Sequence, residues 1–542
     1  MRACVTTGMA LCGVVASGLA MAQQTSVVDG PHNLSVSGPG TTRAVSEDQV
    51  CIFCHAPHNS TPVRPLWNRS MPVDAYSIYS SPSLDADPGQ PTGSSKMCLS
   101  CHDGTIALGA VASRQTPIVM AGGRQTLSDG TGHIGTDLSD DHPISFRYDS
   151  TLAARDPLLK PPSVLPDQIR LDPNEELQCT SCHDAHNNFF GDFMVMANSD
   201  SELCISCHAV GTTTVQAHRQ CSACHQSHTA PSGPYLLRRS TVSETCLACH
   251  DGSVPMAANV ADDMRKLAVH DTAAPIAFQE QDDQTNCTSC HDPHTMGSGS
   301  GAPPAIHPNL GRIDGVNASG SPIPAANTEF EVCFKCHADG DRTRPVINRV
   351  IAQTNTRLEF SPTAVSFHPV QSPGRNSDVP SLLPPWTTAS MMYCSDCHGS
   401  ESSLTPGDPN RGGGVHGSNY EGLLRARYET SDDTSESAAA YALCYTCHNR
   451  NHILSEDNSS FPGHRRHIVE ERTPCSACHD AHGIASTQGS TMNNSNLINF
   501  DTRIVFPNAR GRLEFRDTGR FRGECFLQCH GQDHDPLGYE QN

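Results

Sequence analysis

Closely spaced cysteine pairs, each followed by a histidine, constrain this chain more than any other feature. Of its 26 cysteines, Cys4 and Cys12 lie in the first 22 residues, and the other 24 form twelve pairs. Histidine directly follows the second cysteine of every pair, although histidine is only 29 of the 542 residues. Twelve such coincidences in twelve pairs are not a chance result.

The pattern CXXCH is the covalent attachment signature of c-type haem. It predicts twelve haems, eleven attached through CXXCH and one through CXXXCH, the motif CFLQCH. In chain order the cysteines and histidines are Cys51, Cys54, His55; Cys98, Cys101, His102; Cys179, Cys182, His183; Cys204, Cys207, His208; Cys221, Cys224, His225; Cys246, Cys249, His250; Cys287, Cys290, His291; Cys333, Cys336, His337; Cys394, Cys397, His398; Cys444, Cys447, His448; Cys475, Cys478, His479; and Cys525, Cys529, His530.

The spacing has a physical reason. Cysteines three apart share one face of a helical turn, where both thiols reach one haem edge and the next histidine can turn its ring toward the iron. Cys525 and Cys529, four apart, also share a helical face, so we expect a twelfth haem with one residue looped out. Disulfides, zinc sites and thiol exchange also use cysteine pairs, but none of them requires the following histidine.

Seventeen histidines remain after twelve are subtracted from 29, enough for a second axial ligand on most irons. Five stand three residues after an attachment histidine: His58, His186, His228, His294 and His482. Such a residue cannot pass round the ring to the opposite face of its own haem, so we expect it to bind a neighbouring haem. The other predicted distal ligands are His32, His142, His218, His270, His368, His416, His467 and His534, and the predicted spares are His133, His307, His452 and His464. Methionine, which would raise the potential, shows no matching placement.

The pairs alternate between two kinds. The residue after the first cysteine is small and polar in one kind (Thr180, Ser222, Thr288, Ser395, Ser476) and large and apolar in the other (Leu99, Ile205, Leu247, Phe334, Tyr445, Phe526), with Ile52 as the exception. Six two-haem units therefore follow one another, which is the pattern of an array. We expect a hexahaem half over residues 23–260 and another over 261–542, divided within 251–286.

The composition supplies little for an ordinary core. Apolar residues make up 36% of the chain, and its 42 glycines and 39 prolines favour loops. We expect an irregular fold, mostly coil with short helices around a covalent haem stack, and a small strand region over 495–516 near the C-terminus. Little conventional hydrophobic core is needed where porphyrins fill the interior.

Residues 1–22 have the features of a secretory signal peptide, with a cleavage site after Ala22. Lipidation of Cys12 is the alternative reading. No later stretch approaches the ~18 apolar residues of a transmembrane helix. The net charge of −21 makes nucleic acid and anionic lipid poor partners.

The CHDPH and CHDAH motifs and the alternation of the pairs resemble the doubled-CXXCH family of multihaem c-type cytochromes, which metal-respiring bacteria export. The resemblance runs from Cys51 to His534. It implies haems stacked in close pairs, ligands that cross between neighbours, and conduction of electrons along the stack. The chain departs from the pattern at CFLQCH and at Ile52, and the first departure puts the geometry of the last haem in question.

The haem count favours an exported dodecahaem electron conduit in the periplasm or on the outer cell surface. Its expected partners are periplasmic or outer-membrane cytochromes, an outer-membrane conduit or a metal acceptor, and end-to-end self-association is a further possibility. The alternative is a reductase of a nitrogen or sulfur oxyanion, with one iron open to substrate. Against it, no attachment histidine is replaced by lysine, as in the nitrite reductases that share these motifs, and histidines are in surplus. A zinc or disulfide scaffold would be colourless.

Overall fold

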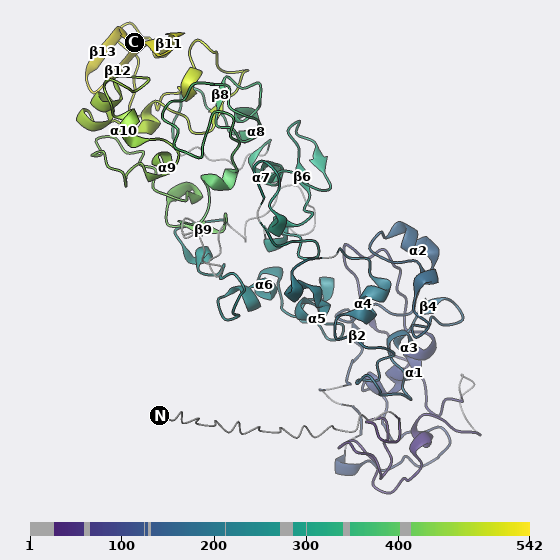
Figure 1. Cartoon of the computed structure of the whole chain (residues 1–542). Coiled ribbons are helices and arrows are strands. Elements are labelled where there is room, and N and C mark those ends of the chain that lie inside the picture. Colours follow the sequence, from purple (N-terminus) through teal and green to yellow (C-terminus); the bar gives the residue numbers. More distant parts are fainter. Residues whose placement is uncertain are drawn as a thin grey trace, which may run out of the picture. The chain divides into compact units, whose positions relative to one another are not determined.

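The computed structural model describes residues 26–58, 66–123, 125–127, 130, 132–211, 213–270, 286–299, 301–339, 347–401 and 414–541. Most of this chain is coil, with short helices and small sheets (Figure 1). The irregular fold expected from the sequence is therefore confirmed. No helix in the described part is long and apolar enough to cross a membrane. The predicted signal peptide lies outside the described residues.

Short helices carry eleven of the twelve cysteine pairs. The α-helices are α1 (Gly93–His102), α2 (Ser150–Arg155), α3 (Cys179–Cys182), α4 (Glu202–Cys207), α5 (Cys221–Cys224), α6 (Val242–His250), α7 (Glu329–His337), α8 (Thr356–Glu359), α9 (Ala442–Tyr445) and α10 (Arg450–Ile453). Four more pairs begin in 3-10 turns: η1 (Val50–Phe53), η7 (Cys287–Ser289), η9 (Cys394–Asp396) and η13 (Cys475–Ala477). Helices this short are not stable alone, so their stability comes from what they pack against.

Five two-stranded ladders, each only two residues long, join segments of the coil. They are β1 (Ser77–Ile78) with β2 (Asp137–Leu138), β3 (Phe146–Arg147) with β4 (Glu176–Leu177), β5 (Ala268–Val269) with β9 (Gly417–Ser418), β6 (Gly315–Val316) with β7 (Pro322–Ile323), and β8 (Ser366–Phe367) with β10 (Gly483–Ile484). The first ladder is parallel and the others are antiparallel. The β5–β9 and β8–β10 ladders end next to predicted distal histidines.

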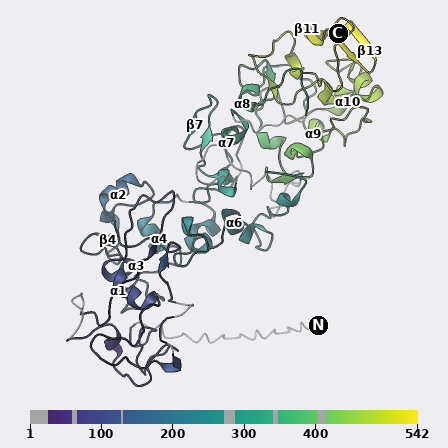
Figure 2. The same ribbon diagram turned by 180° about the vertical axis from the view of Figure 1, so that it is seen from behind.

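The C-terminal sheet is the largest element. It is antiparallel and consists of β11 (Glu514–Gly519), β12 (Arg522–Cys529) and β13 (Gln532–Glu540). Two opposite views show it near α10 (Figure 1, Figure 2). A small strand region was expected over 495–516. The sheet begins at Glu514 and ends at Glu540, so it overlaps that range only at its start, because the asparagine-rich stretch before it forms a turn in which Asn496 has φ 58°.

Buried apolar residues form eight separate clusters among the described residues rather than one core. Attachment cysteines pack against several of them; Cys54 and Cys101, for example, contact the cluster that contains Phe53 and Leu108. This is the arrangement expected where porphyrins occupy the space between small protein clusters.

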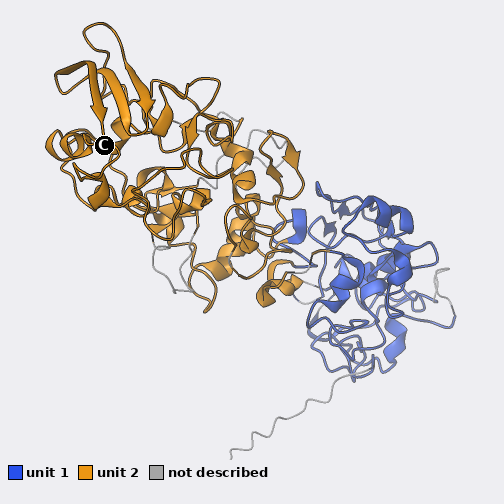
Figure 3. Cartoon of the chain, turned by 45° about the horizontal axis from the view of Figure 1, so that its top comes forward, with its two compact units in different colours: residues 1–209, 226–236 blue, residues 210–225, 237–542 orange. Residues whose placement is uncertain are grey.

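The chain divides into two compact units (Figure 3). Unit 1 comprises residues 1–209 and 226–236, and unit 2 comprises residues 210–225 and 237–542. Unit 1 contains the first four cysteine pairs and unit 2 the other eight. The division falls earlier in the chain than the boundary expected near residue 260. Residues 271–285 of the expected boundary stretch, 251–286, lie outside the described residues. Two hexahaem halves therefore stay a prediction.

Candidate functional site

Each of the first eleven attachment motifs includes one helical turn, which in α1, α6 and α7 is part of a longer helix. In this turn the backbone N–H of the histidine donates to the carbonyl of the first cysteine, as from His183 to Cys179 and from His479 to Cys475, at 3.0 Å in both cases. A bond from residue i to i−4 closes one turn of helix. It therefore gathers two thiols and one imidazole on a short, regular piece of backbone.

Ten attachment histidines face a second histidine ring, with ring centroids 6.0 to 6.3 Å apart. The pairs, attachment residue first, are His55–His186, His102–His32, His183–His228, His208–His142, His225–His294, His250–His218, His291–His416, His337–His270, His398–His482 and His479–His464. An eleventh attachment histidine, His448, lies near His368. Burial and the charge of His368 lower the pKa of His448 to about 4.

This separation fits one metal ion between two imidazoles. A metal–imidazole bond is about 2 Å long and the ring nitrogen lies about 1.2 Å from the ring centre, so two rings on one metal have centres about 6.4 Å apart. In unit 1 a mainly apolar cavity is lined by Cys179 and His228, which belong to the same predicted haem, and by Leu99 and Leu138. The residues present therefore fit a haem iron with two histidine ligands.

The hydrogen bonds of the rings leave the same nitrogen free for iron. Nδ1–H donates to a backbone carbonyl in attachment residues His102, His183, His250, His291, His398 and His479, and in His32, His142, His270, His368 and His467. Such a bond fixes the tautomer and orients the ring, with Nε2 as the ligand atom. Burial also lowers the pKa of His398 and His416 to about 4, which favours the neutral form that a metal requires.

The histidines opposite the attachment residues are joined two by two. In three two-haem units, Nδ1–H of one such histidine donates to the carbonyl just before the other: His32 to Ala185, His270 to Val415 and His368 to Ala481, at 3.3, 2.6 and 2.6 Å. In a fourth, the backbone N–H of His142 donates to Ser227, just before His228, at 2.8 Å. One local backbone link therefore positions both second ligands of a two-haem unit.

Carboxylates replace carbonyls at two of these rings. Nδ1 of His228 lies 2.9 Å from Asp141, and Nδ1 of His482 lies 3.2 Å from Glu359; both acids are buried. Burial is the largest single influence and acts to lower the pKa of both rings, but the hydrogen bond and the negative charge of the carboxylate together outweigh it, and both pKa values are raised. The carboxylates make these imidazoles stronger electron donors than the others.

Replacing Glu359 with glutamine is expected to raise the potential of the haem bound through His398 and His482. The neutral amide removes a negative charge that stabilises the oxidised iron, and a one-electron potential shifts ~59 mV per tenfold change in equilibrium constant, so an effect on the order of tens of millivolts follows. Spectroelectrochemical titration measures it. Glu421→Gln, an exposed site, is the control, and equal potentials in both variants would contradict the expectation.

Neighbouring motifs meet through their cysteines. Within two-haem units the second cysteines are neighbours: Cys54 and Cys101, Cys182 and Cys207, Cys224 and Cys249, Cys290 and Cys336, Cys397 and Cys447. Between successive units the first cysteines lie within hydrogen-bonding reach: Cys98 and Cys179, Cys246 and Cys287, Cys333 and Cys394, Cys444 and Cys475. Contacts between second cysteines alternate with contacts between first cysteines. Haems attached at these cysteines would therefore follow one another in chain order within each of the two compact units.

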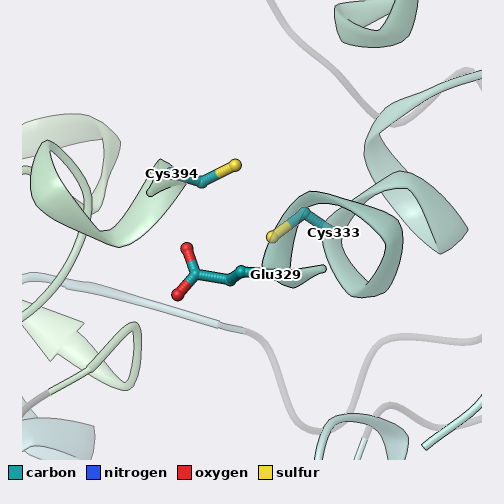
Figure 4. Close-up of side chains that lie close together, drawn as sticks. All are labelled: Glu329, Cys333 and Cys394. Atoms are coloured by element: carbon teal, nitrogen blue, oxygen red, sulfur yellow. The ribbon is translucent and has the colours of Figure 1, made fainter. Parts of the chain in front are cut away.

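One such contact includes a carboxylate. Glu329 lies beside Cys333 and Cys394, with the ligand atoms of all three within 4.8 Å of one another (Figure 4). Among the described residues this is the group whose spacing suits a bound metal ion. Both thiols are attachment cysteines, however, and the carboxylate accepts hydrogen bonds from the N–H and hydroxyl of Ser395 at 2.9 and 2.7 Å. Glu329 therefore fastens one attachment turn to the next.

The twelfth motif differs from the other eleven. Cys525 and Cys529 lie on strand β12, so the helical turn expected for them is wrong. His530 lies in the turn before β13 with φ 48°, and its Nε2–H donates to both oxygens of Asp432 at 3.0 and 2.9 Å. The ring that lies opposite another histidine is instead His534, with its centroid 6.4 Å from that of His467.

The structure brings most, but not all, of the predicted second ligands to an attachment histidine. His58 is exposed, and no other histidine ring lies beside it in the described part of the chain. His464, expected to be spare, lies opposite His479. The sequence signal for it was HRRH, in which His464 stands three residues before His467 and hence on the same side of a helical turn.

Two protein families match the chain. Residues 172–212 and 214–254 each match the doubled CXXCH motif family, and each stretch spans one two-haem unit. Residues 321–490 match a family described as outer membrane cytochrome MtrC/MtrF-like, domains II/IV. The chain is a multihaem c-type cytochrome. The two matches support covalently bound haem c and electron transport, as expected from the motifs. No curated protein matches significantly.

Proposed function

We propose that this cytochrome is an exported dodecahaem electron conduit that carries electrons along a chain of haems with two histidine ligands each, as part of extracellular electron transfer. A bound haem iron supplies reversible one-electron chemistry. The contribution of the polypeptide is to attach, orient and order these groups along the chain.

The observation that carries the proposal is the near-constant separation of the histidine rings. Ten attachment histidines have a second ring at 6.0 to 6.3 Å, and an iron held by two such rings has no position for a substrate. This favours a conduit over a reductase. The alternating cysteine contacts support it further, because they order the attachment sites from one end of each compact unit to the other.

Attachment itself needs only the thiols and the haem vinyl groups. In each thioether the thiol S–H would add across a vinyl C=C of the haem, which would form an S–C bond and place the hydrogen on the other vinyl carbon, so no oxidant would be consumed. Burial raises the pKa of Cys54 and Cys478 to about 12, because a buried site disfavours the charged thiolate.

The proposed place of the protein follows from the family matched over residues 321–490, whose description is of outer membrane cytochromes, and from the expected signal peptide. We infer a position in the periplasm or on the outer surface, with electrons received from a periplasmic cytochrome and passed to an outer-membrane conduit, another cytochrome or a metal acceptor. The net charge of −21 favours metallic or basic partners over nucleic acid.

Two measurements on the purified wild-type protein test the proposal. Intact mass spectrometry is expected to give the chain plus twelve haems. Electron paramagnetic resonance of the oxidised protein is expected to give only low-spin iron, because every iron has two imidazole ligands. A full equivalent of high-spin iron that binds nitrite or carbon monoxide would favour the reductase instead.

A further inference from the structure

The twelfth motif, CFLQCH, ends at His530, and a second histidine, His534, follows it by four residues. In the structure these two rings have different partners. We propose that the iron of the twelfth haem is held by His467 and His534, and that His530, the histidine directly after Cys529, is not a ligand. This deepens the proposed function and rests on it, since it concerns one of the twelve haems.

His530 has the wrong nitrogen engaged for a ligand. Its Nε2–H donates to the carboxylate of Asp432 at 2.9 to 3.0 Å. In the six attachment histidines that donate to a backbone carbonyl, the donor is Nδ1, and Nε2 is left for the metal. A ring whose Nε2 carries a proton bonded to a carboxylate cannot at the same time donate an Nε2 lone pair to iron.

His534 lies beside a second histidine ring, which His530 does not among the described residues. Its ring centroid lies 6.4 Å from that of His467, close to the separation of the ten pairs described above and to that required by one intervening iron. His467 has its Nδ1–H on the carbonyl of Gly463 at 2.7 Å. Its Nε2 is therefore the nitrogen left for the metal, as in the other second ligands.

The hairpin places His534 next to the attachment cysteines. In the pairing of β12 with β13, His534 is directly opposite Leu527, which stands midway between Cys525 and Cys529. Residues two apart on a strand share a face, and so do residues directly opposite on neighbouring strands. Cys525, Leu527 and Cys529 all pack on one cluster. Both thiols and the ring of His534 are therefore on one face of the hairpin.

The other two-haem units supply an independent argument. Four of the other five have two second ligands held close together by a backbone hydrogen bond, such as His368 and His482, or His270 and His416. In the last unit the corresponding residues are His464 and His467, three apart in sequence. His464 lies opposite His479 at 6.3 Å, which leaves His467 for the twelfth haem. Cys478 is also near Cys525 and Cys529, the contact that second cysteines make in the other units.

Two single substitutions in the full-length, haem-loaded protein distinguish the two histidines. His534→Ala is expected to keep twelve haems by mass and to convert one twelfth of the iron from low-spin to high-spin, because one iron loses an axial ligand. His530→Ala is the matched control and is expected to keep twelve haems, all low-spin. Loss of a haem or a new high-spin signal in His530→Ala overturns the assignment, and so does an unchanged spectrum in His534→Ala.

His534→Met tests the same assignment with less disturbance. Methionine still binds the iron, so all haems are expected to stay low-spin while one of twelve potentials rises; twelve unchanged potentials overturn the inference. The haem count of the wild-type protein distinguishes a failure of this ligand assignment from a failure of the proposed dodecahaem conduit. A wild-type mass of fewer than twelve haems overturns the dodecahaem count itself, whereas an exchange of the His530 and His534 phenotypes overturns only the ligand assignment.

Discussion

Replacing His482 with alanine is expected to convert one haem iron of the oxidised cytochrome from low-spin to high-spin without loss of a haem. His482 follows His479 by three residues. Its ring, however, lies 6.1 Å from that of His398, which belongs to an earlier attachment motif. The substitution is therefore expected to remove one axial ligand from the iron of the haem attached at Cys394 and Cys397. Electron paramagnetic resonance and carbon monoxide binding to the reduced protein measure the change.

His58→Ala is a matched control, because His58 also follows an attachment histidine by three residues, in CHAPH rather than CHDAH. Its ring is exposed and faces no other histidine in the described residues. We expect no change in spin state. Equal spectra for the two variants would contradict the role of His482. A second variant, His398→Ala, is expected to affect the same iron, so that it and His482→Ala are not additive.

The attachment sites could be predicted from the sequence because they are local. A haem thioether pair needs two thiols within one turn and a histidine next to them, and CXXCH contains all three. The crossing of the extra histidines also follows from local geometry, since His186 or His294 cannot reach the far side of its own haem. In the structure their rings lie 6.1 and 6.2 Å from those of His55 and His225, and ligation of those irons stays a prediction.

The choice of second ligands could not be predicted in full because it depends on contacts between distant segments. The β8–β10 ladder, for example, joins residues more than 110 positions apart and brings His368 beside His482. Nothing in the sequence near His368 indicates that partner. The same holds for the strand conformation of Cys525 and Cys529, which depends on pairing with β13 and not on their spacing.

A buried arginine shows how much such long-range contacts contribute to stability. Arg69 is fully buried, and its guanidinium donates to the carbonyls of Leu108, Ser100 and Ala107 at 2.7, 2.9 and 3.0 Å. Ser100 lies between the cysteines of the second attachment motif. Arg349 does the same at another motif, where it donates to the carbonyls of Ser476 and His479. In both places one cation satisfies carbonyls of an attachment turn and of a distant loop.

Replacing Arg69 with methionine is therefore expected to destabilise unit 1 by about 3 kcal/mol. Methionine retains much of the apolar stem, but three buried carbonyls lose their donor, at about 1 to 3 kcal/mol each, while removal of a buried charge offsets part of the loss. Urea unfolding followed by haem absorbance measures the shift in midpoint.

Arg43→Met is the control for the same unit, because the side chain of Arg43 is exposed, and a change of this kind on the surface is expected to stay within about 0.5 kcal/mol. If Arg69→Met and Arg43→Met unfold at the same urea concentration, the carbonyl contacts of Arg69 do not stabilise the fold. If only Arg69→Met is destabilised, and haem content is unchanged, the loop that carries Arg69 holds the second attachment turn in place. The irons would then owe their spacing to polypeptide contacts as well as to covalent attachment.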